Sequence, residues 1–553
     1  MVNSKFLFNF FKKGKIFFYS FCAFYLMIFS SSCRDHTHAD KKIFRYNETS
    51  GIASLDPAFA KNQSVMWAIH QLYNTLIEVD SNMLLKPSVA ASWQFADSNK
   101  TIIFNLRNDI YFQDDECFLN NKGRKLIAAD IAYSFNRIIN KNTASPGAWI
   151  FNNRVTELNP FTALNDSTFQ IKLQAPFQPI LGILSMQYCS IVPHEAVDKY
   201  GNDFRRHPVG TGPFSFVAWE EGQAMVLKKN DHYFEKDSSG KSLPYIDGIK
   251  INFYDSKATE FLEFQQGRLD FINDIDPSFK DEILSKTGNL KSKWKDKIML
   301  QKHPYLNIEF FGILTDTNNA LVKNSPLRLI KIRQAINYGI DRKKMMLYVR
   351  NSIGTAAESG FVPQGLPSFD KEKVKGYLYN PVKAKQLLAD AGFVNGKNLP
   401  EIKLLTIPIY ANLASYVANE LKQIGITVKV EAMQKSLLLE QTSKSQALFF
   451  RGSWIDDYPD AENYLGVFYS KNPAPPNYTR FNNAAFDELY ERALSQTNDS
   501  LRYETYQQMD NIIIANAPVI PLWYDEAIHL VQKNIKNFVP NSLNMLELRR
   551  VQK

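Results

Sequence analysis

The stretch around which this chain is organised reads Phe449-Phe450-Arg451-Gly452-Ser453-Trp454-Ile455-Asp456-Asp457-Tyr458-Pro459-Asp460. It begins with apolar residues, as a buried strand does, and ends in a Tyr-Pro-Asp turn that leaves the sheet. Between these ends lie a guanidinium, an indole and a group of carboxylates. Such a set suits an extended zwitterion, because a carboxylate can neutralise an ammonium group and a guanidinium can bind a carboxylate with two hydrogen bonds. A strand that ends in a solvated acidic turn is the alternative.

The N-terminus has the pattern of a secretory signal peptide. Four lysines and no acidic residue precede a mainly apolar run, Ile16 to Phe29, which is shorter than the about 20 residues that cross a bilayer. Ser30-Ser31-Ser32-Cys33 then resembles the bacterial lipobox, in which the cysteine is acylated, although leucine is usual in place of Ser30. We predict a lipoprotein signal peptide over 1–32, lipid attachment at Cys33 and a tether over 33–41. An ordinary signal peptide or an uncleaved anchor are the alternatives.

The composition limits the partners of the exported part. The 553 residues are enough for about three domains. The formal net charge of +9 includes the lysines of the signal peptide, and the other basic residues are dispersed, so we expect no nucleic-acid partner. Cys117 and Cys189 are the cysteines of the folded part. Export permits a disulfide between them, but the sequence does not show whether their positions allow one.

Common enzyme motifs are missing from the chain. No G-x-S-x-G nucleophile elbow is present, and Asp198 stands where the H-E-x-x-H motif would need a second histidine after His194-Glu195. Gly210-Thr211-Gly212-Pro213 lacks the phosphate-loop pattern and precedes an apolar run, so we predict a tight turn that opens a strand. We expect no enzyme, no cofactor and no metal site. An exported hydrolase or a chaperone is the alternative from another class.

Hydrophobic periodicity and end signals predict an α/β chain. A proline at the start of one helix and Gly392 after its end are typical helix boundaries. The order helix, glycine, strand between 305 and 520 is typical of an α/β lobe. The predicted helices are Val65–Tyr73, Ala128–Arg137, Leu327–Arg350, Pro381–Ala391 and Leu413–Ile424, and the predicted strands are Lys42–Tyr46, Thr101–Arg107 and Ile426–Val430.

A series of short motifs follows in order from about residue 42 to the C-terminus. The motifs are Ser54-Leu55-Asp56-Pro57, 84–93, Phe104-Asn105-Leu106-Arg107, 129–137, 142–146, Val209-Gly210-Thr211-Gly212-Pro213-Phe214, Gln266-Gly267-Arg268-Leu269-Asp270, Arg333-Gln334-Ala335-Ile336-Asn337, Asn477-Tyr478-Thr479-Arg480-Phe481 and Ala517-Pro518-Val519-Ile520-Pro521-Leu522. In this order they resemble the solute-binding proteins of peptide-type ABC importers, extracellular solute-binding protein family 5, which includes the dipeptide and oligopeptide binding proteins.

This resemblance implies an α/β, two-lobed periplasmic-binding-protein-like fold (class II, cluster C) with an extra third domain. Lobe one would comprise 42–80, 186–304 and 523–553, the small extra domain 81–185, and lobe two 305–522. A peptide would bind between the lobes, pairing its main chain with strands of the protein. The receptor would be a monomer on the periplasmic face or cell surface, held at the membrane by its lipid, and would deliver peptide to an ABC permease and its ATPase.

The resemblance also implies which residues bind the two charged ends of a peptide. Asp457 stands where the family has its partner for the α-ammonium group, and Arg451 is then the candidate partner of the peptide carboxylate. Trp454 would line the wall between them, unless it is a core residue. Asp456 is a rival for Asp457, because a shift of one residue turns a side chain to the opposite face of a strand.

Other predicted ligand contacts come from both lobes. Ser453 and Ile455 would offer backbone groups from lobe two, and Asn62 and Gln63 would do so from lobe one. Tyr305 would lie at the crossover between the lobes, where hinge packing is its alternative role.

Two departures from the family's oligopeptide branch leave the ligand open. The partners of that branch's disulfide fall at Asn307 and Ile455, and the second arginine expected near Thr442 is absent, Lys444 being the nearest cation. We predict a receptor for oligopeptides or dipeptides. A receptor of the same fold for an oligosaccharide, a metal chelate or haem is the alternative.

Overall fold

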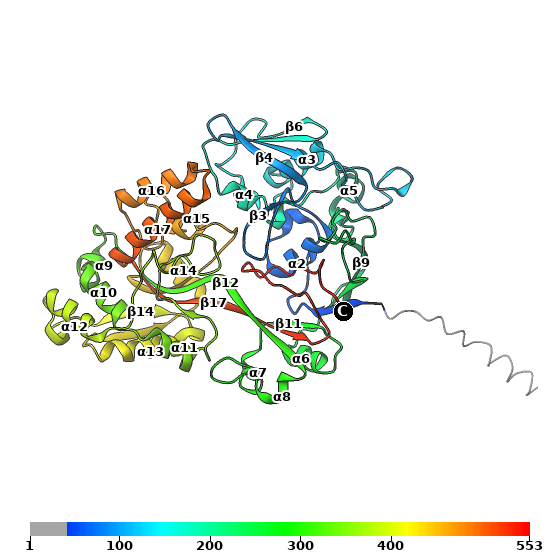
Figure 1. The fold of residues 1–553 in the computed structure, drawn as a ribbon. Coiled ribbons are helices and arrows are strands. Elements are labelled where there is room, and N and C mark those ends of the chain that lie inside the picture. Colours follow the sequence, from blue (N-terminus) through cyan, green and yellow to red (C-terminus); the bar gives the residue numbers. More distant parts are fainter. Residues whose placement is uncertain (1–40) are drawn as a thin grey trace, which may run out of the picture. The chain divides into compact units, whose positions relative to one another are not determined.

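The computed structural model describes residues 41–553 (Figure 1). The predicted signal peptide and Cys33 lie outside the described residues. The chain divides into two units, Met1–Lys42 and Ile43–Lys553, and the second is described here. Among the described residues, none of the helices combines the length and the apolar character needed to cross a membrane.

The largest sheet has seven strands, and two of them are long. β12 (Ile298–Ile313) and β17 (Val519–Gln532) run antiparallel, with paired residues from Ile298 and Gln532 at one end to Gly312 and Val519 at the other. Figure 1 shows these two strands side by side across the centre of the drawing. The sheet order is β11-β17-β12-β16-β14-β15, with β13 on β17; the other bounds are β11 Phe271–Asn273, β13 Thr355–Ala356, β14 Ile402–Thr406, β15 Val428–Ala432 and β16 Phe449–Ile455.

Three smaller sheets are built from the first half of the chain. One has the order β1-β10-β9-β8, and in it β1 pairs in parallel with β10 across more than 200 residues of sequence. Another, β4-β5-β7-β6, is covered by α3 and falls within 81–185, the range expected for the small extra domain. The third is the pair β2-β3. The bounds are β1 Ile43–Asn47, β2 Ile77–Val79, β3 Leu85–Pro87, β4 Ala90–Ala96, β5 Thr101–Leu106, β6 Phe161–Asn165, β7 Thr168–Lys172, β8 Phe214–Glu220, β9 Ala224–Lys229 and β10 Gly248–Asn252.

Several of the helices pack against the large sheet. α10, α12 and α13 cover the large sheet and share a core with Phe311 and Phe449 from β12 and β16. The helix bounds are α2 Gln63–Leu72, α3 Ala128–Ile139, α4 Ile180–Ile183, α5 His194–Tyr200, α6 Lys257–Gln265, α7 Pro277–Ile283, α8 Ser292–Lys295, α9 Ala320–Lys323, α10 Ile330–Tyr338, α11 Arg342–Val349, α12 Pro381–Asp390, α13 Ala411–Lys422, α14 Lys435–Ser443, α15 Glu462–Leu465, α16 Ala484–Ser495 and α17 Asp499–Asn516.

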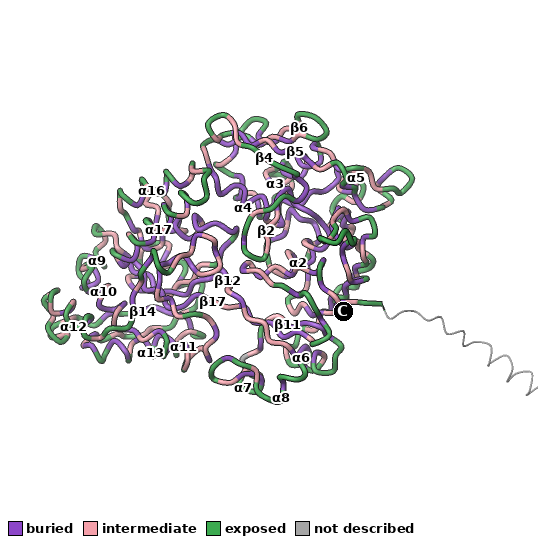
Figure 2. The backbone as a smooth tube through the Cα atoms, viewed as in Figure 1, coloured by how far each residue is buried: buried purple, intermediate pink, exposed green. Residues whose placement is uncertain are grey.

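The C-terminal tail belongs to the same core as the first strand. Phe44 and Trp67 are buried in one cluster with Leu548 and Val551. The Lys553 ammonium also donates to the Ile43 carbonyl at 2.9 Å. Figure 2 shows buried and half-buried residues along β12 and β17 and exposed residues in the outer loops. The first strand and the C-terminal tail are therefore held in one core.

One predicted helix is wrong. Leu327–Arg350 is not continuous: α10 ends before Gly339, and the Asp341 side chain accepts a hydrogen bond from Lys344 N at the start of α11. An aspartate at this position satisfies a free N–H group of a new helix, so it marks a boundary and not a helix interior. The other predicted helices and strands exist with shifts of a few residues at their ends.

The predicted turn at Gly210-Thr211-Gly212-Pro213 is confirmed, since β8 begins at Phe214. A Cβ atom on Gly210 would lie 2.1 Å from the Leu72 carbonyl oxygen, so the close approach of this turn to α2 requires glycine. Cys117 and Cys189 are both free thiols, which answers the disulfide question that the sequence left open.

Candidate ligand-binding site

A cavity of about 710 Å³ lies within the second unit, in the size range of pockets for small ligands. It is bounded by segments that are far apart in sequence. They are 60–63, Met66, part of 70–86, Trp149, 185–188, Pro213, Tyr305-Leu306 and 455–459. The tail contributes Val539, Asn541, Leu543, Met545, Glu547, Arg549 and Arg550.

The turn after β16 carries two carboxylates to the cavity wall. β16 pairs with β12, and the last pair is Ile455 with Asn307. Asp456 N–H then donates to the Leu306 carbonyl at 2.9 Å, which fixes the start of the turn. Asp456 and Asp457 follow at the point where the chain leaves the sheet, and both line the cavity.

Asp456 and Asp457 have different surroundings. Asp456 is only 6% exposed, and neither of its side-chain oxygens has a hydrogen-bond partner among the described residues. Burial, with Asp457, Asp460 and Glu462 nearby, raises the pKa of Asp456 well above its usual range. Asp457 is exposed, but its exposed surface lines the cavity, where partial desolvation also raises its pKa. The Asp457 carboxyl group is therefore available to a cation in the cavity, whereas the Asp456 oxygens are buried behind it.

Three other lining residues match the predicted contacts. Asn62 caps α2 by accepting from Val65 N at 3.1 Å, and the Gln63 amide oxygen accepts from Asn273 at 3.3 Å. Tyr305 is half-buried on β12. The predicted residues that the structure brings together in the cavity wall are Asn62, Gln63, Tyr305, Ile455 and Asp457.

Arg451, Ser453 and Trp454 do not line this cavity. The Arg451 guanidinium forms a two-pronged ion pair with Glu309 on β12, in which Nη2 lies 2.6 Å from Oε2, and it stacks 4.1 Å above the Tyr410 ring. Glu309 is 1% exposed, and burial raises its pKa to about 7 although Arg451 lowers it. The role of Arg451 as carboxylate partner stays a prediction, and it requires Glu309 to release the guanidinium.

Trp454 has a structural contact of its own. Its indole N–H donates to the Asn463 side-chain oxygen at 2.8 Å, and the ring packs against a buried cluster that includes Tyr464 and Phe361. Its role in lining a ligand also stays a prediction.

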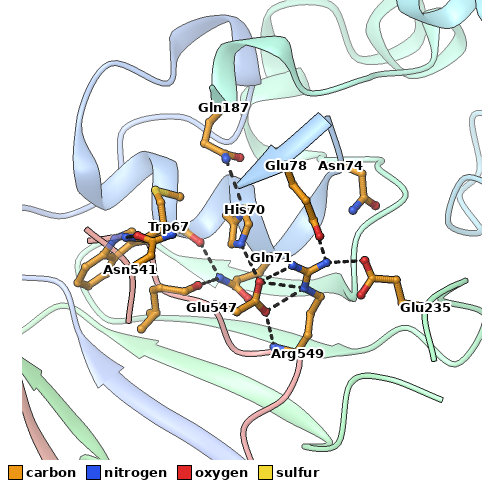
Figure 3. A network of polar contacts seen from close by, with 12 residues as sticks. Trp67, His70, Gln71, Asn74, Glu78, Gln187, Glu235, Asn541, Glu547 and Arg549 are labelled. Carbon is orange, nitrogen blue, oxygen red and sulfur yellow. Dashed lines mark hydrogen bonds and ion pairs between the residues drawn. The ribbon is translucent and has the colours of Figure 1, made fainter. Parts of the chain in front are cut away.

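An ion-pair network that the sequence did not indicate lies on the cavity wall (Figure 3). Arg549 Nη1 lies 2.7 Å from Glu235 and 3.1 Å from Glu78, and the guanidinium also pairs with Glu547. His70 Nε2 lies 3.3 Å from Glu547. Figure 3 shows Glu78 from β2, His70 from α2 and Arg549 from the C-terminal tail converging, with Glu235 reaching in from the segment between β9 and β10. Burial alone would raise the pKa of Glu547, but Arg549 and His70 hold it well below its usual range.

One sequence signal pointed to this network. Leu546 and Leu548 alternate with Glu547 and Arg549, and alternation in an extended segment sends the two kinds of side chain to opposite faces. The leucines are buried in the core, while Glu547 and Arg549 reach the cavity. The partners Glu78 and Glu235 are hundreds of residues away, so the sequence did not indicate them.

Residues 85–476 match the profile of the family described as bacterial extracellular solute-binding proteins, family 5 Middle. The chain belongs to this family. It is 26% identical over 487 residues to heme-binding protein A of Haemophilus influenzae, covering 85% of this chain and 84% of that protein. It is 24% identical over 533 residues to the dipeptide-binding protein DppE of Bacillus subtilis, covering 92% and 91%.

Solved structures show the same fold. HbpA2 from Haemophilus parasuis superposes with a TM-score of 0.79 at 23% identity, covering 92% of this chain and 99% of that one. The unliganded open form of the periplasmic murein tripeptide binding protein MppA gives a TM-score of 0.80 at 20% identity, covering 93% and 98%. The predicted α/β fold of the periplasmic-binding-protein type is confirmed for this family 5 solute-binding protein.

Proposed function

We propose that this chain is a lipid-anchored receptor of an ABC importer that captures oligopeptides or dipeptides in the cavity and passes them unaltered to a membrane permease and its ATPase. The observation that carries the proposal is Asp457 on the wall of a cavity of about 710 Å³, next to the unpartnered carboxyl group of Asp456. A carboxyl group in such a site is suited to an α-ammonium group, because a desolvated ion pair is stronger than an exposed one.

Relatives named for dipeptide and glutathione binding support a peptide, whereas the relative named for heme binding suggests a second candidate. A haem carries carboxylates and no ammonium group, so it offers no cationic side group to Asp457 on the cavity wall. A free peptide offers its α-ammonium group, so Asp457 favours a peptide over haem.

The lipid anchor is proposed from the sequence of residues 1–33 alone. Monomeric action and docking to the importer are proposed from the family. No catalytic step is proposed, because a receptor needs to bind and release its ligand intact.

The Asp457→Asn variant tests the peptide proposal. Removing the charge while keeping the shape should weaken the binding of a free tripeptide such as Ala-Ala-Ala by about 2 kcal/mol or more, which is about 30-fold. Acetylating the peptide N-terminus should weaken binding to the wild type by a similar amount. Titration calorimetry of the exported protein purified in detergent measures both effects.

Asp390→Asn is the control, because Asp390 pairs with Lys331 on the outer side of α12 and does not line the cavity. Equal affinity of the wild type and Asp457→Asn for the free peptide, or equal affinity for the free and acetylated peptides, would refute the role of Asp457.

A further inference from the structure

Among side chains in direct contact, the network around Arg549 has more carboxyl groups than basic groups. One guanidinium faces the carboxyl groups of Glu78, Glu235 and Glu547. His70 is the other basic group in contact, through Glu547. Burial raises the pKa of Glu235, so Glu78 and Glu547 are the carboxylates that carry charge toward the cavity, and they share the one guanidinium.

Part of this charge faces the cavity. The Glu78 and Glu547 side chains are 21% and 25% exposed, and both line the cavity together with His70 and Arg549. Figure 3 shows Glu78 and Glu547 on different sides of the Arg549 guanidinium. This single guanidinium therefore does not shield all of their carboxylate oxygens. Carboxylates in a partly desolvated wall attract a cation more strongly than carboxylates on an open surface.

A second, independent observation also points to a positively charged ligand. Asp456 belongs to the turn after β16, not to the Arg549 network, and it lines the same cavity. Its side chain is 94% buried, and both oxygens lack a partner among the described residues. A buried carboxyl group without a partner costs stability, so its place beside Asp457 in the cavity wall favours a cation at this point.

The cations that line the cavity are either paired or exposed. Lys86 pairs with Asp80 at 2.8 Å, and Arg549 is held by its three carboxylates. Lys61 and Arg550 are exposed residues of the lining. Lys86 and Arg549 are thus engaged by carboxylates, whereas the exposed side chains of Lys61 and Arg550 can meet a carboxylate of the ligand.

We propose that the cavity selects peptides that carry a cationic side chain, an ammonium or a guanidinium, in addition to their α-ammonium group. Asp457, with Asp456 buried beside it, takes one charge, and Glu78 and Glu547 take the other. This inference rests on the proposed function, since it names the class of peptide that the same cavity binds.

Matched tripeptides test the selection. Lys-Ala-Ala, Ala-Lys-Ala and Ala-Ala-Lys are compared by calorimetry with their norleucine and glutamate counterparts, which change the charge at one position. We expect at least one lysine peptide to bind about tenfold more tightly than its norleucine match, and the glutamate peptide to bind more weakly still. The preference for lysine should fall to less than about threefold in Glu78→Gln, which keeps an acceptor for Arg549.

Glu431→Gln is the matched control, because Glu431 pairs with Lys403 on the exposed side of β14 and β15. Asp456→Asn is a second test that leaves the Arg549 network intact, and it should also weaken the lysine peptides more than the norleucine peptides. Equal binding of lysine and norleucine peptides at every position would overturn the inference while leaving the peptide receptor standing. A preference for lysine that survives in both variants would overturn the assignment of residues. Failure of all the peptides to bind would overturn the proposed function itself.

Discussion

Asp456 and Asp457 are neighbours in sequence with different exposure, and this difference decides how each responds to pH. Asp456 is buried, and its surroundings raise its pKa well above the usual value for an aspartate. It therefore keeps its proton over a wider pH range than Asp in an unfolded chain. A bound cation favours the charged form, so binding should release a proton from this site.

The Asp456→Asn variant tests this proton release. In the wild type, the affinity for a cationic peptide should rise as the pH increases through the raised pKa, because less work is then needed to remove the proton. Calorimetry at about pH 6 in buffers of different ionisation enthalpy counts the protons released. The variant should release fewer protons than the wild type. Equal proton release by the wild type and Asp456→Asn would show that another group supplies the proton.

The sequence predicted part of the site at the residue scale. The family pattern indicated Asp457, Ile455, Tyr305, Asn62 and Gln63, and the structure brings them to one cavity. It did not indicate that Glu309 pairs with Arg451, because the two residues are 142 positions apart and meet only through the pairing of β12 with β16. Cross-strand partners depend on register, which a single sequence specifies only weakly.

At the scale of elements, β12 and β17 bring together two buried histidines. The ring centroids of His303 and His529 lie 4.8 Å apart, and His529 Nε2 lies 2.9 Å from the Asn544 side-chain oxygen. Burial lowers the pKa of His303 to about 4 and that of His529 to about 3. Both rings are neutral in the folded protein at neutral pH.

This pair predicts a loss of stability in acid. An unfolded histidine has a pKa of about 6.5, so below that pH the unfolded chain binds more protons than the folded one. The stabilisation is complete above about pH 6.5 and is lost as the pH falls toward the folded pKa values. Each histidine contributes about 1.4 kcal/mol per pH unit in this window.

The His303→Leu variant isolates one of the two contributions. The slope of the free energy of unfolding between about pH 6 and pH 4.5 should decrease by about 1 kcal/mol per pH unit, whatever the variant's stability at neutral pH. Denaturant titrations at several pH values measure this slope. His232→Asn is the control, because His232 is exposed. An unchanged slope in His303→Leu would show that His303 is not neutral in the folded state.

Helices and strands were more predictable than their ends. The Asn380-Pro381 start and the Gly392 end of α12 are local signals, and Gly392 has the positive φ of 94° expected for such an end. The break between α10 and α11 was missed because Ile332, Ile336 and Ile340 are buried at helical spacing up to Asp341, and buried apolar residues resume at Met345. In the prediction, the hydrophobic periodicity outweighed the single capping signal of Asp341.

At the scale of the whole molecule, the order of motifs along the chain identified the family, but long-range pairing could not be derived from it. β1 pairs with β10, and the C-terminal tail shares a core with Phe44. These contacts join distant segments, and no local pattern encodes them. The domain limits over 42–80, 81–185, 186–304, 305–522 and 523–553 stay predictions.

The proposed anchor can be tested on the whole chain. Cys33→Ser removes the thiol that the lipid would need, so the protein should move from the membrane fraction to the soluble fraction of the envelope or to the medium. Fractionation followed by immunoblotting measures the distribution, and Cys22→Ser is the control within the signal peptide. Retention of Cys33→Ser in the membrane fraction would favour an uncleaved anchor.

Native mass spectrometry tests most directly whether the protein binds peptides without altering them. The exported protein, purified without denaturation and mixed with a pool of synthetic tripeptides and tetrapeptides, is measured as the intact complex and then after release of its ligand. The account predicts one intact, unmodified peptide per protein, and much less of it on Asp457→Asn. Cleaved peptides, or wild-type protein that binds no peptide from the pool, would contradict it.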